Sequence, residues 1–151
     1  MKQTVPSFLQ PGDTIGISAT ARFATTESLA IAKRVIEAEG FQCYYSPDIS
    51  VQQHQVAGTV AERVQHFNAL IHNPDIKAIW NVRGGYGSAE IVDLVDWGAL
   101  VAQPKWLIGF SDFTTFLCHG IQKGIATLHA PMPISFSITH PDALTATFDV
   151  L

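Results

Sequence analysis

The sequence predicts an α/β fold: an open, mostly parallel sheet with helices on both faces, as in Rossmann-like and flavodoxin-like three-layer sandwiches. Short apolar runs alternate along the chain with segments of helical period. Strand, helix and strand follow one another repeatedly, and such units form parallel strands joined by right-handed crossovers. With 47% hydrophobic and 15% charged residues among 151, the composition supports a sizeable core and excludes a disordered chain.

Five strands are expected, each in a short apolar run that turn residues delimit. Pro11-Gly12-Asp13 precedes the first run, and Asn73-Pro74-Asp75 precedes the third. Runs of this length, bounded by turn signals, are typical of buried strands. The expected strands cover 14–19, 41–45, 76–82, 106–110 and 125–128.

Helices are expected where apolar residues recur at a spacing of three or four. Thr59 and Glu62 form a capping box at the start of one helix, since each side chain can bond the other residue's backbone N–H. Gly40 and Gly124 are typical residues at the end of a helix. The expected helices cover 26–39, 60–72, a segment through 91–95, 111–123 and 142–151.

The last expected helix bears on the domain organisation. It runs through Leu144, Phe148 and Leu151 without a closing glycine or basic residue. A helix cut at its apolar face indicates a longer protein, although a docked terminal helix would give the same pattern. We therefore expect residues 1–135 to form an N-terminal α/β domain and residues 136–151 to begin a linker towards a further C-terminal domain.

Composition and spacing exclude several function classes. The chain has 9 Lys+Arg against 13 Asp+Glu and no basic stripe, so a nucleic-acid partner is not expected. Cys43 and Cys118 lie far apart, and the histidines show no metal-ligand spacing, so neither a disulfide scaffold nor a metal site is expected. No signal peptide or membrane-spanning run is visible, which predicts a cytoplasmic protein without membrane contact.

A glycine loop, Arg83-Gly84-Gly85-Tyr86-Gly87, follows the third expected strand. Its glycines let the backbone approach a ligand, and the helix start after it favours an anion. Glu90 stands where the dinucleotide fingerprint has its last glycine, and no Gly-Lys-Ser/Thr of a P-loop follows. The loop is therefore either a plain tight turn or a ligand-binding segment in which Arg83 could clamp a substrate carboxylate.

A second loop, Gly109-Phe110-Ser111-Asp112-Phe113, follows the fourth expected strand. A serine at a sharp strand-to-helix turn exposes its hydroxyl, as in a nucleophile elbow, but Ser111 could equally be a helix N-cap. A serine nucleophile also needs a base. His119 lies two helical turns beyond Ser111, too far to reach it, and a lone His129 after the fifth strand is not a convincing base.

Several motifs together resemble the LD-carboxypeptidase family of serine peptidases, in matching order and spacing from near Val5 to Met132. The segments that carry this resemblance are Pro11-Gly12-Asp13-Thr14-Ile15-Gly16, Arg83-Gly84-Gly85-Tyr86-Gly87-Ser88, Pro104-Lys105 and Gly109-Phe110-Ser111-Asp112. The family includes murein tetrapeptide carboxypeptidases, which remove a terminal D-alanine during cell-wall recycling, and microcin-immunity peptidases. Ala130 and Phe110 stand where family members often have Gly and Tyr, and neither change touches the nucleophile.

The resemblance implies a serine-type hydrolase without cofactor. Ser111 would be the nucleophile, and the backbone N–H groups of Gly85 and Asp112 would form the oxyanion hole. The full-length protein would hydrolyse the bond between an L-centre diamino acid and a terminal D-amino acid in murein peptides, and would form a homodimer. The Glu and His of the family's triad belong to a C-terminal domain, so this chain alone is expected to be inactive or nearly so.

Three interpretations follow from the residues and the resemblance. The first is the nucleophile-bearing half of an LD-carboxypeptidase, in which the position of Arg83, Gly84 and Tyr86 in the glycine loop predicts contact with the substrate. The second is an α/β module that binds a nucleotide or phosphate at residues 83–87. The third is an interaction domain, because separation from a second domain would expose an apolar face.

Overall fold

The computed structural model describes residues 3–151, which form a sheet in the order β2-β1-β3-β4-β5 with every neighbouring pair parallel. The chain builds outward from β1 in one direction to β2 and then in the other from β3, which puts a topological switch point between β1 and β3. The predicted α/β class and parallel sheet are confirmed. The strands are β1 (Thr14–Ser18), β2 (Gln42–Tyr44), β3 (Ile76–Asn81), β4 (Trp106–Gly109) and β5 (Leu128–His129).

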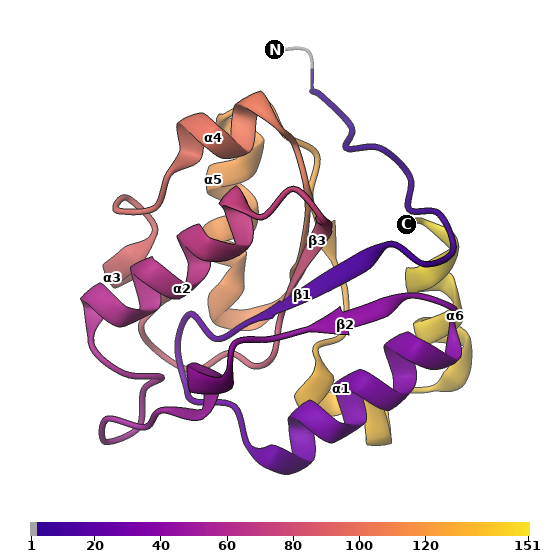
Figure 1. The fold of residues 1–151 in the computed structure, drawn as a ribbon, viewed down its shortest axis with the longest axis horizontal. Helices are drawn as coiled ribbons and strands as arrows, with labels where there is room; N and C mark the ends of the chain where they lie inside the picture. The colour runs from indigo at the N-terminus through magenta and orange to yellow at the C-terminus, as the bar shows by residue number, and fades with distance from the viewer. Residues whose placement is uncertain (1–2) are drawn as a thin grey trace.

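Helices cover both faces of the sheet (Figure 1). One side carries α1 and α6, and the other carries the helices from α2 to α5. The helices are α1 (Thr26–Ala38), α2 (Val60–His72), α3 (Ser88–Ile91), α4 (Trp97–Ala102), α5 (Thr114–Gln122) and α6 (Pro141–Asp149), with short 3-10 turns at η1 (Pro47–Ser50), η2 (Ser111–Phe113) and η3 (Pro133–Ile138).

The central strands are buried on both faces, and alternate residues feed two separate cores. Ala78 and Trp80 of β3 belong to the cluster under α1 and α6, whereas Ile79 belongs to the cluster under α2 and α5. This alternation explains why the strands read as continuous apolar runs in the sequence. Within the described residues, no helix combines the length and the apolar character of a membrane span.

Two expected elements differ in the structure. The helix expected through 91–95 is wrong in extent, because α3 ends at Ile91 after a single turn and a separate α4 follows. Asp96 is the N-cap of α4 and accepts a hydrogen bond from the Ala99 N–H at 2.9 Å. The spacing of apolar residues did not reveal this second helix start. The strand expected at 125–128 pairs with β4 only at 128–129, since Ile125 forms an isolated bridge with Thr4.

The last helix packs against the core on the α1 side. Phe148 stacks on Phe41 with ring centroids 6.1 Å apart and lies 5.4 Å from the Trp80 ring. The Leu9 N–H donates a hydrogen bond to the Leu151 carbonyl, and both residues are buried. The segment over 142–151 therefore contributes apolar residues to the core of the described chain.

Candidate active site

The two loops singled out by the sequence lie side by side at the carboxyl edge of the sheet. They follow β3 and β4, which are direct neighbours. A Cβ built at Gly84 would stand 3.0 Å from the Ser111 Oγ and 3.4 Å from the Asp112 backbone nitrogen. A side chain at Gly84 would therefore force Ser111 or the loop to shift by a few tenths of an ångström, so a glycine suits the place where the glycine loop meets the serine turn.

An open cavity of about 270 Å³ lies where the two loops meet. Gly84, Gly85 and Ser111 line it together with Phe110. Ligands of parallel α/β folds bind at this edge of the sheet. The cavity is therefore the candidate site, and side chains outside the two loops also contribute to it, among them Arg22, Met132 and Ile134.

Ser111 has a left-handed backbone conformation, with φ at 57°. For an L-residue with a side chain this costs about 1–3 kcal/mol, and it is the conformation that a nucleophile elbow requires. Its side chain does not cap the following helix, since neither η2 nor α5 has a side-chain cap hydrogen bond. Within residues 3–151 the Ser111 hydroxyl has no hydrogen-bond partner. The N-cap interpretation of Ser111 is therefore wrong.

Two backbone donors near Ser111 are unused. Within residues 3–151, neither the Gly85 N–H nor the Asp112 N–H donates a hydrogen bond to protein. Gly85 lies in the cavity wall with φ at 128°, a conformation open mainly to glycine. Free N–H groups beside a serine hydroxyl can bind the negative oxygen of a tetrahedral intermediate.

Asn81, fully buried at the end of β3, ties the glycine loop to the end of β1. Its amide Oδ1 accepts hydrogen bonds from the Ser18 hydroxyl at 3.0 Å and the Thr20 hydroxyl at 3.1 Å. Its Nδ2 donates to the Arg83 carbonyl at 2.7 Å. A fully paired polar group of this kind fixes the loop at the switch point between β1 and β3.

Two arginines line the cavity without a carboxylate partner among the described residues. Arg83 lies over the Phe23 ring, with Cζ 5.9 Å from the centroid, and Arg22 donates to the Gln55 amide oxygen at 2.7 Å. Burial, and then the positive charge of Arg22, lower the pKa of the Arg83 guanidinium. It nevertheless stays cationic at neutral pH, so the cavity presents uncompensated positive charge to an anion.

Three residues considered from the sequence lie outside the cavity: Tyr86 as a substrate contact, and His119 and His129 as bases. The Tyr86 side chain is 84% exposed and does not line the cavity. His119 stacks on Trp97, with ring centroids 4.7 Å apart. His129 and Phe110 form an edge-type ring pair with centroids 6.1 Å apart, and His129 lines a neighbouring apolar pocket. Within the described residues, no histidine or carboxylate bonds the Ser111 hydroxyl, and no three His, Cys, Asp or Glu side chains gather to hold a metal.

Fold and site together define a class: a parallel α/β domain with a strained, exposed serine at a strand-to-helix turn. The family description "LD-carboxypeptidase N-terminal domain" matches residues 15–130. This chain therefore belongs to the LD-carboxypeptidase family, as the motifs of the sequence predict.

Named relatives agree with this assignment. The murein tetrapeptide carboxypeptidase of Pseudomonas aeruginosa is 31% identical over 126 residues, which cover 83% of this chain and 41% of that protein. The microcin C7 self-immunity protein MccF of Escherichia coli is 33% identical over 157 aligned positions, covering 99% of this chain and 45% of MccF. The chain thus spans less than half the length of these relatives.

A solved structure supports the fold. The structure of MccF in complex with glutamyl sulfamoyl guanosine superposes on this chain with a TM-score of 0.84 at 29% identity. The superposition covers 97% of this chain and 44% of the MccF chain. The arrangement of strands and helices is therefore that of the matching part of MccF.

Sequence reasoning missed Arg22, Asn81 and Arg63 as contributors to the site. Asn81 is a polar residue at the end of an apolar strand, and this position could have indicated it, because ligands bind at the carboxyl ends of parallel strands. Arg63 occupies the apolar stripe of α2, three residues after Val60 and four before Phe67, where a charge is out of pattern. Arg22 gave no such signal, because only tertiary packing brings it to Gly85.

Proposed function

We propose that this chain is the nucleophile-bearing part of a serine LD-carboxypeptidase. The complete protein would cleave the bond between an L-centre diamino acid and a terminal D-amino acid in murein peptides, in the cytoplasm during cell-wall recycling. The observation that carries the proposal is Ser111: its φ of 57°, its unbonded hydroxyl and the two unused N–H groups beside it. The Pseudomonas aeruginosa relative, named a murein tetrapeptide carboxypeptidase, supports the substrate class.

The mechanism is acyl transfer through Ser111. A histidine held by a glutamate, both supplied by the C-terminal domain, removes the hydroxyl proton while Oγ attacks the carbonyl carbon. The oxyanion accepts hydrogen bonds from the Gly85 and Asp112 N–H groups. The intermediate collapses, the histidine protonates the leaving amine of the D-amino acid, and water then hydrolyses the acyl ester to restore Ser111.

The positive charge of the cavity would favour substrates whose terminal carboxylate lies beside the scissile bond. A D-amino acid at the end of a peptide carries a free carboxylate beside the scissile bond, and Arg83, which lines the cavity, would bind it. The guanidinium of Arg22, which has no carboxylate partner among the described residues, adds positive charge to the same cavity. This arrangement favours removal of a terminal residue over cleavage within a chain, because an internal peptide bond brings no carboxylate.

The proposal predicts that hydrolysis requires more than this chain. With no base at Ser111 among residues 3–151, the chain alone should react weakly, since triad members act as a unit. The test compares the 151-residue chain with the protein expressed at its natural length, using a murein tetrapeptide that ends in D-alanine. We expect D-alanine release by the natural-length protein and a loss of more than about 10³-fold in S111A.

Full activity in S111A would overturn the nucleophile assignment.

The same proposal includes a homodimer, which sedimentation of the natural-length protein tests. A tetrapeptide with a terminal D-alanine amide serves as the matched control substrate, because it keeps the scissile bond and lacks the carboxylate.

A second candidate is nucleotide or phosphate binding at the glycine loop. It is favoured by one solved relative, an MccF mutant in complex with adenosine monophosphate, at 28% identity and a TM-score of 0.83. Such binding would raise the melting temperature of both wild type and S111A when adenosine monophosphate is added. A shift with the nucleotide and no release of D-alanine would favour this candidate over the peptidase.

A further inference from the structure

We propose that Arg63 of α2 is a positioning residue, which fixes the glycine loop against the serine turn. The effect that we expect Arg63 to have on catalysis rests on the function proposed above. The effect on the structure of the loop does not rest on that function. Arg63 lies outside the cavity and would act on the reaction only through the backbone that it holds.

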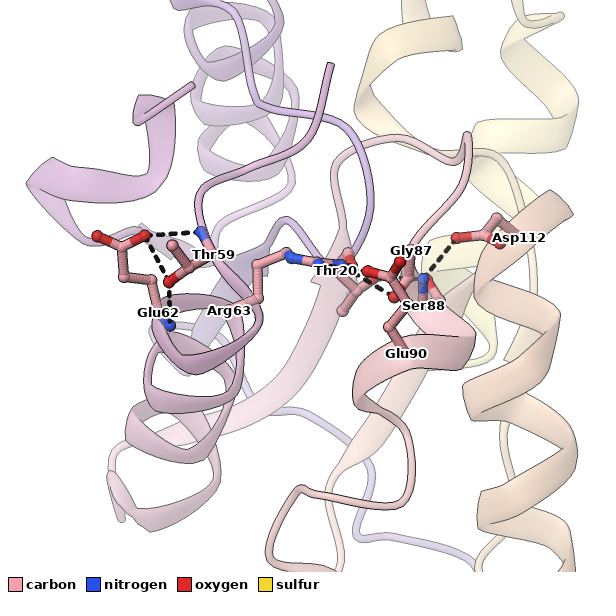
Figure 2. Close-up of polar contacts among 8 residues, drawn as sticks. All are labelled: Thr20, Thr59, Glu62, Arg63, Gly87, Ser88, Glu90 and Asp112. Atoms are coloured by element: carbon pink, nitrogen blue, oxygen red, sulfur yellow. Dashed lines mark hydrogen bonds and ion pairs between the residues drawn. The ribbon is translucent and has the colours of Figure 1, made fainter. Parts of the chain in front are cut away.

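The Arg63 guanidinium is buried and joins three separate segments (Figure 2). Nη1 donates hydrogen bonds to the Thr20 carbonyl at 3.0 Å and to the Gly87 carbonyl at 2.9 Å. Nη2 forms an ion pair with the Glu90 carboxylate at 2.6 Å. One cation from α2 thereby connects the loop after β1, the end of the glycine loop and the start of α3.

The contact with Gly87 reaches the serine turn through a single peptide unit. The Gly87 carbonyl accepts from Arg63, and the N–H of the same peptide bond, on Ser88, donates to the Asp112 carboxylate at 3.0 Å. The C=O and N–H of a trans peptide point in opposite directions. The peptide plane is therefore held between a guanidinium on one side and, on the other, the carboxylate of the residue that follows Ser111 (Figure 2).

A second bond keeps this peptide unit from turning. The Ser88 hydroxyl lies 2.7 Å from the Thr20 hydroxyl, and both side chains are buried. The Thr20 carbonyl also accepts the hydrogen bond from Arg63, so the guanidinium and the Ser88 hydroxyl both contact Thr20 on the loop after β1. Rotation of the 87–88 peptide would break the bonds to Arg63 and Asp112 together.

The burial of Arg63 is better explained by a role in positioning the glycine loop than by a gain in folding stability. Arg63 lies on a helix stripe where an apolar side chain would pack without desolvating a charge, and because its partner Glu90 is 59% exposed, the ion pair adds little net stability. Its Nε has no hydrogen-bond partner among the described residues. A Cβ at Gly87 would stand 2.5 Å from Nη1, so the loop has a glycine where the guanidinium reaches its carbonyl.

The expected effect is on transition-state binding. Gly85 lies two residues before the held peptide and lines the cavity, and under the proposed function its N–H would bind the oxyanion. Loss of Arg63 would leave the Gly87 carbonyl with only the Glu90 N–H, at 3.1 Å, and would loosen the position of the Gly85 N–H relative to the Ser111 turn. Loss of one oxyanion donor lowers kcat about 10²–10³-fold, and a positioning defect should approach the lower figure without a matching change in KM.

The test uses the natural-length protein with R63M, R63K and the control R34M, which removes an exposed arginine of α1. We expect R63M to lower kcat about 10²-fold with KM within about twofold, and R34M to match wild type. R63K should recover part of kcat, because an ammonium keeps the charge but lacks the planar fork. Hydrogen–deuterium exchange over residues 83–88 should quicken by about tenfold in R63M while β3 stays protected.

A second variant keeps the proposal testable if R63M does not fold. E90Q removes the carboxylate partner, whose side chain is 59% exposed, and should give the same pattern with a smaller fall in kcat. Wild-type exchange over 83–88 and wild-type kcat in a folded R63M or E90Q would overturn the proposal. If wild type releases no D-alanine, the proposed function fails, and the exchange of 83–88 still decides whether Arg63 holds the loop.

Discussion

At the scale of single residues, the site is made by conformations that its sequence neighbours impose. Ser111 and His54 are the two non-glycine residues at positive φ among those described, and Ser111 alone of the two stands at a strand end. Its strain is tolerated because Phe113, fully buried, anchors the turn to the core under α5. A buried anchor beside a strained residue keeps the hydroxyl exposed when relaxation would otherwise turn it inward.

The close approach of Gly84 gives the first prediction. An alanine there would bring its Cβ to 3.0 Å from the Ser111 Oγ, so the serine or the loop must shift. We expect G84A in the natural-length protein to lose about 10-fold or more in kcat, since a misplacement of about 1 Å can cost about 10²-fold. Steady-state kinetics measure it, with G98A as control because Gly98 lies in α4, away from the cavity. Wild-type kcat in G84A would contradict the contact.

Arg83 gives the second prediction. If its guanidinium binds the substrate carboxylate, R83A should raise KM about 10–100-fold, the loss expected for a charge-assisted hydrogen bond. The substrate amide described above should bind wild type and R83A equally, because the missing carboxylate leaves Arg83 without a partner. An unchanged KM for the acid in R83A would remove Arg83 from substrate binding.

At the scale of elements, α2 is held at both ends by side chains. The capping box predicted at its start is present: the Glu62 N–H donates to the Thr59 hydroxyl at 3.2 Å, and the Thr59 N–H donates to the Glu62 carboxylate at 2.7 Å. At its other end, the Lys105 ammonium donates to the Leu70 carbonyl at 2.9 Å and also to the Asn73 carbonyl. Since α2 carries Arg63, these caps also hold the guanidinium in place.

Lys105 gives a prediction about pH. Burial, with the charge of Lys77 adding to it, lowers the pKa of the Lys105 ammonium to about 8, against 10.5 in an open chain. Between these values the unfolded chain keeps a proton that the folded chain has lost, so the contribution of Lys105 to stability increases with pH across that window. Below pH 8 both states are charged, and the desolvation penalty is present in full.

The measurement compares urea unfolding of wild type and K105M at pH 7 and pH 10. We expect the wild type to gain free energy of unfolding relative to K105M as the pH rises. K123M, which removes an exposed lysine, should show no such relative change. A constant difference between wild type and K105M at the two pH values would show that the ammonium keeps an ordinary pKa.

At the scale of the whole molecule, two cores and one positively charged cavity share a chain with a net charge of −4. Arg22 and Arg83 concentrate positive charge at the carboxyl edge of the sheet, so the local field there opposes the field of the whole surface. In the core under α1 and α6, Phe148 of α6 packs against Trp80 and Phe41. The last helix therefore contributes to the core of the described residues.

The packing of α6 gives the last prediction. Truncation of Phe148, a buried ring between Phe41 and Trp80, should cost about 3–5 kcal/mol of unfolding free energy in F148A. Ile138, 86% exposed, supplies the control, and I138A should stay within about 0.5 kcal/mol of wild type. Urea titration followed by tryptophan fluorescence measures both. A loss below about 1 kcal/mol in F148A would mean that α6 does not close this core.

The sequence by itself determined the parallel α/β class, the Thr59–Glu62 capping box and the family, because apolar period, cap chemistry and motif order are local properties of the chain. It also selected the two loops, since a strand followed by glycines or by serine marks a turn at the carboxyl edge.

Only the tertiary structure decided which residues meet there. It gave Ser111 a positive φ and no capping hydrogen bond, because φ at that residue depends on how the turn is anchored in the core. It brought Arg22 to Gly85 and Arg63 to Gly87, pairs whose members are separated by much of the chain. Contacts between distant segments depend on strand order and helix packing, and no local pattern of residues encodes them.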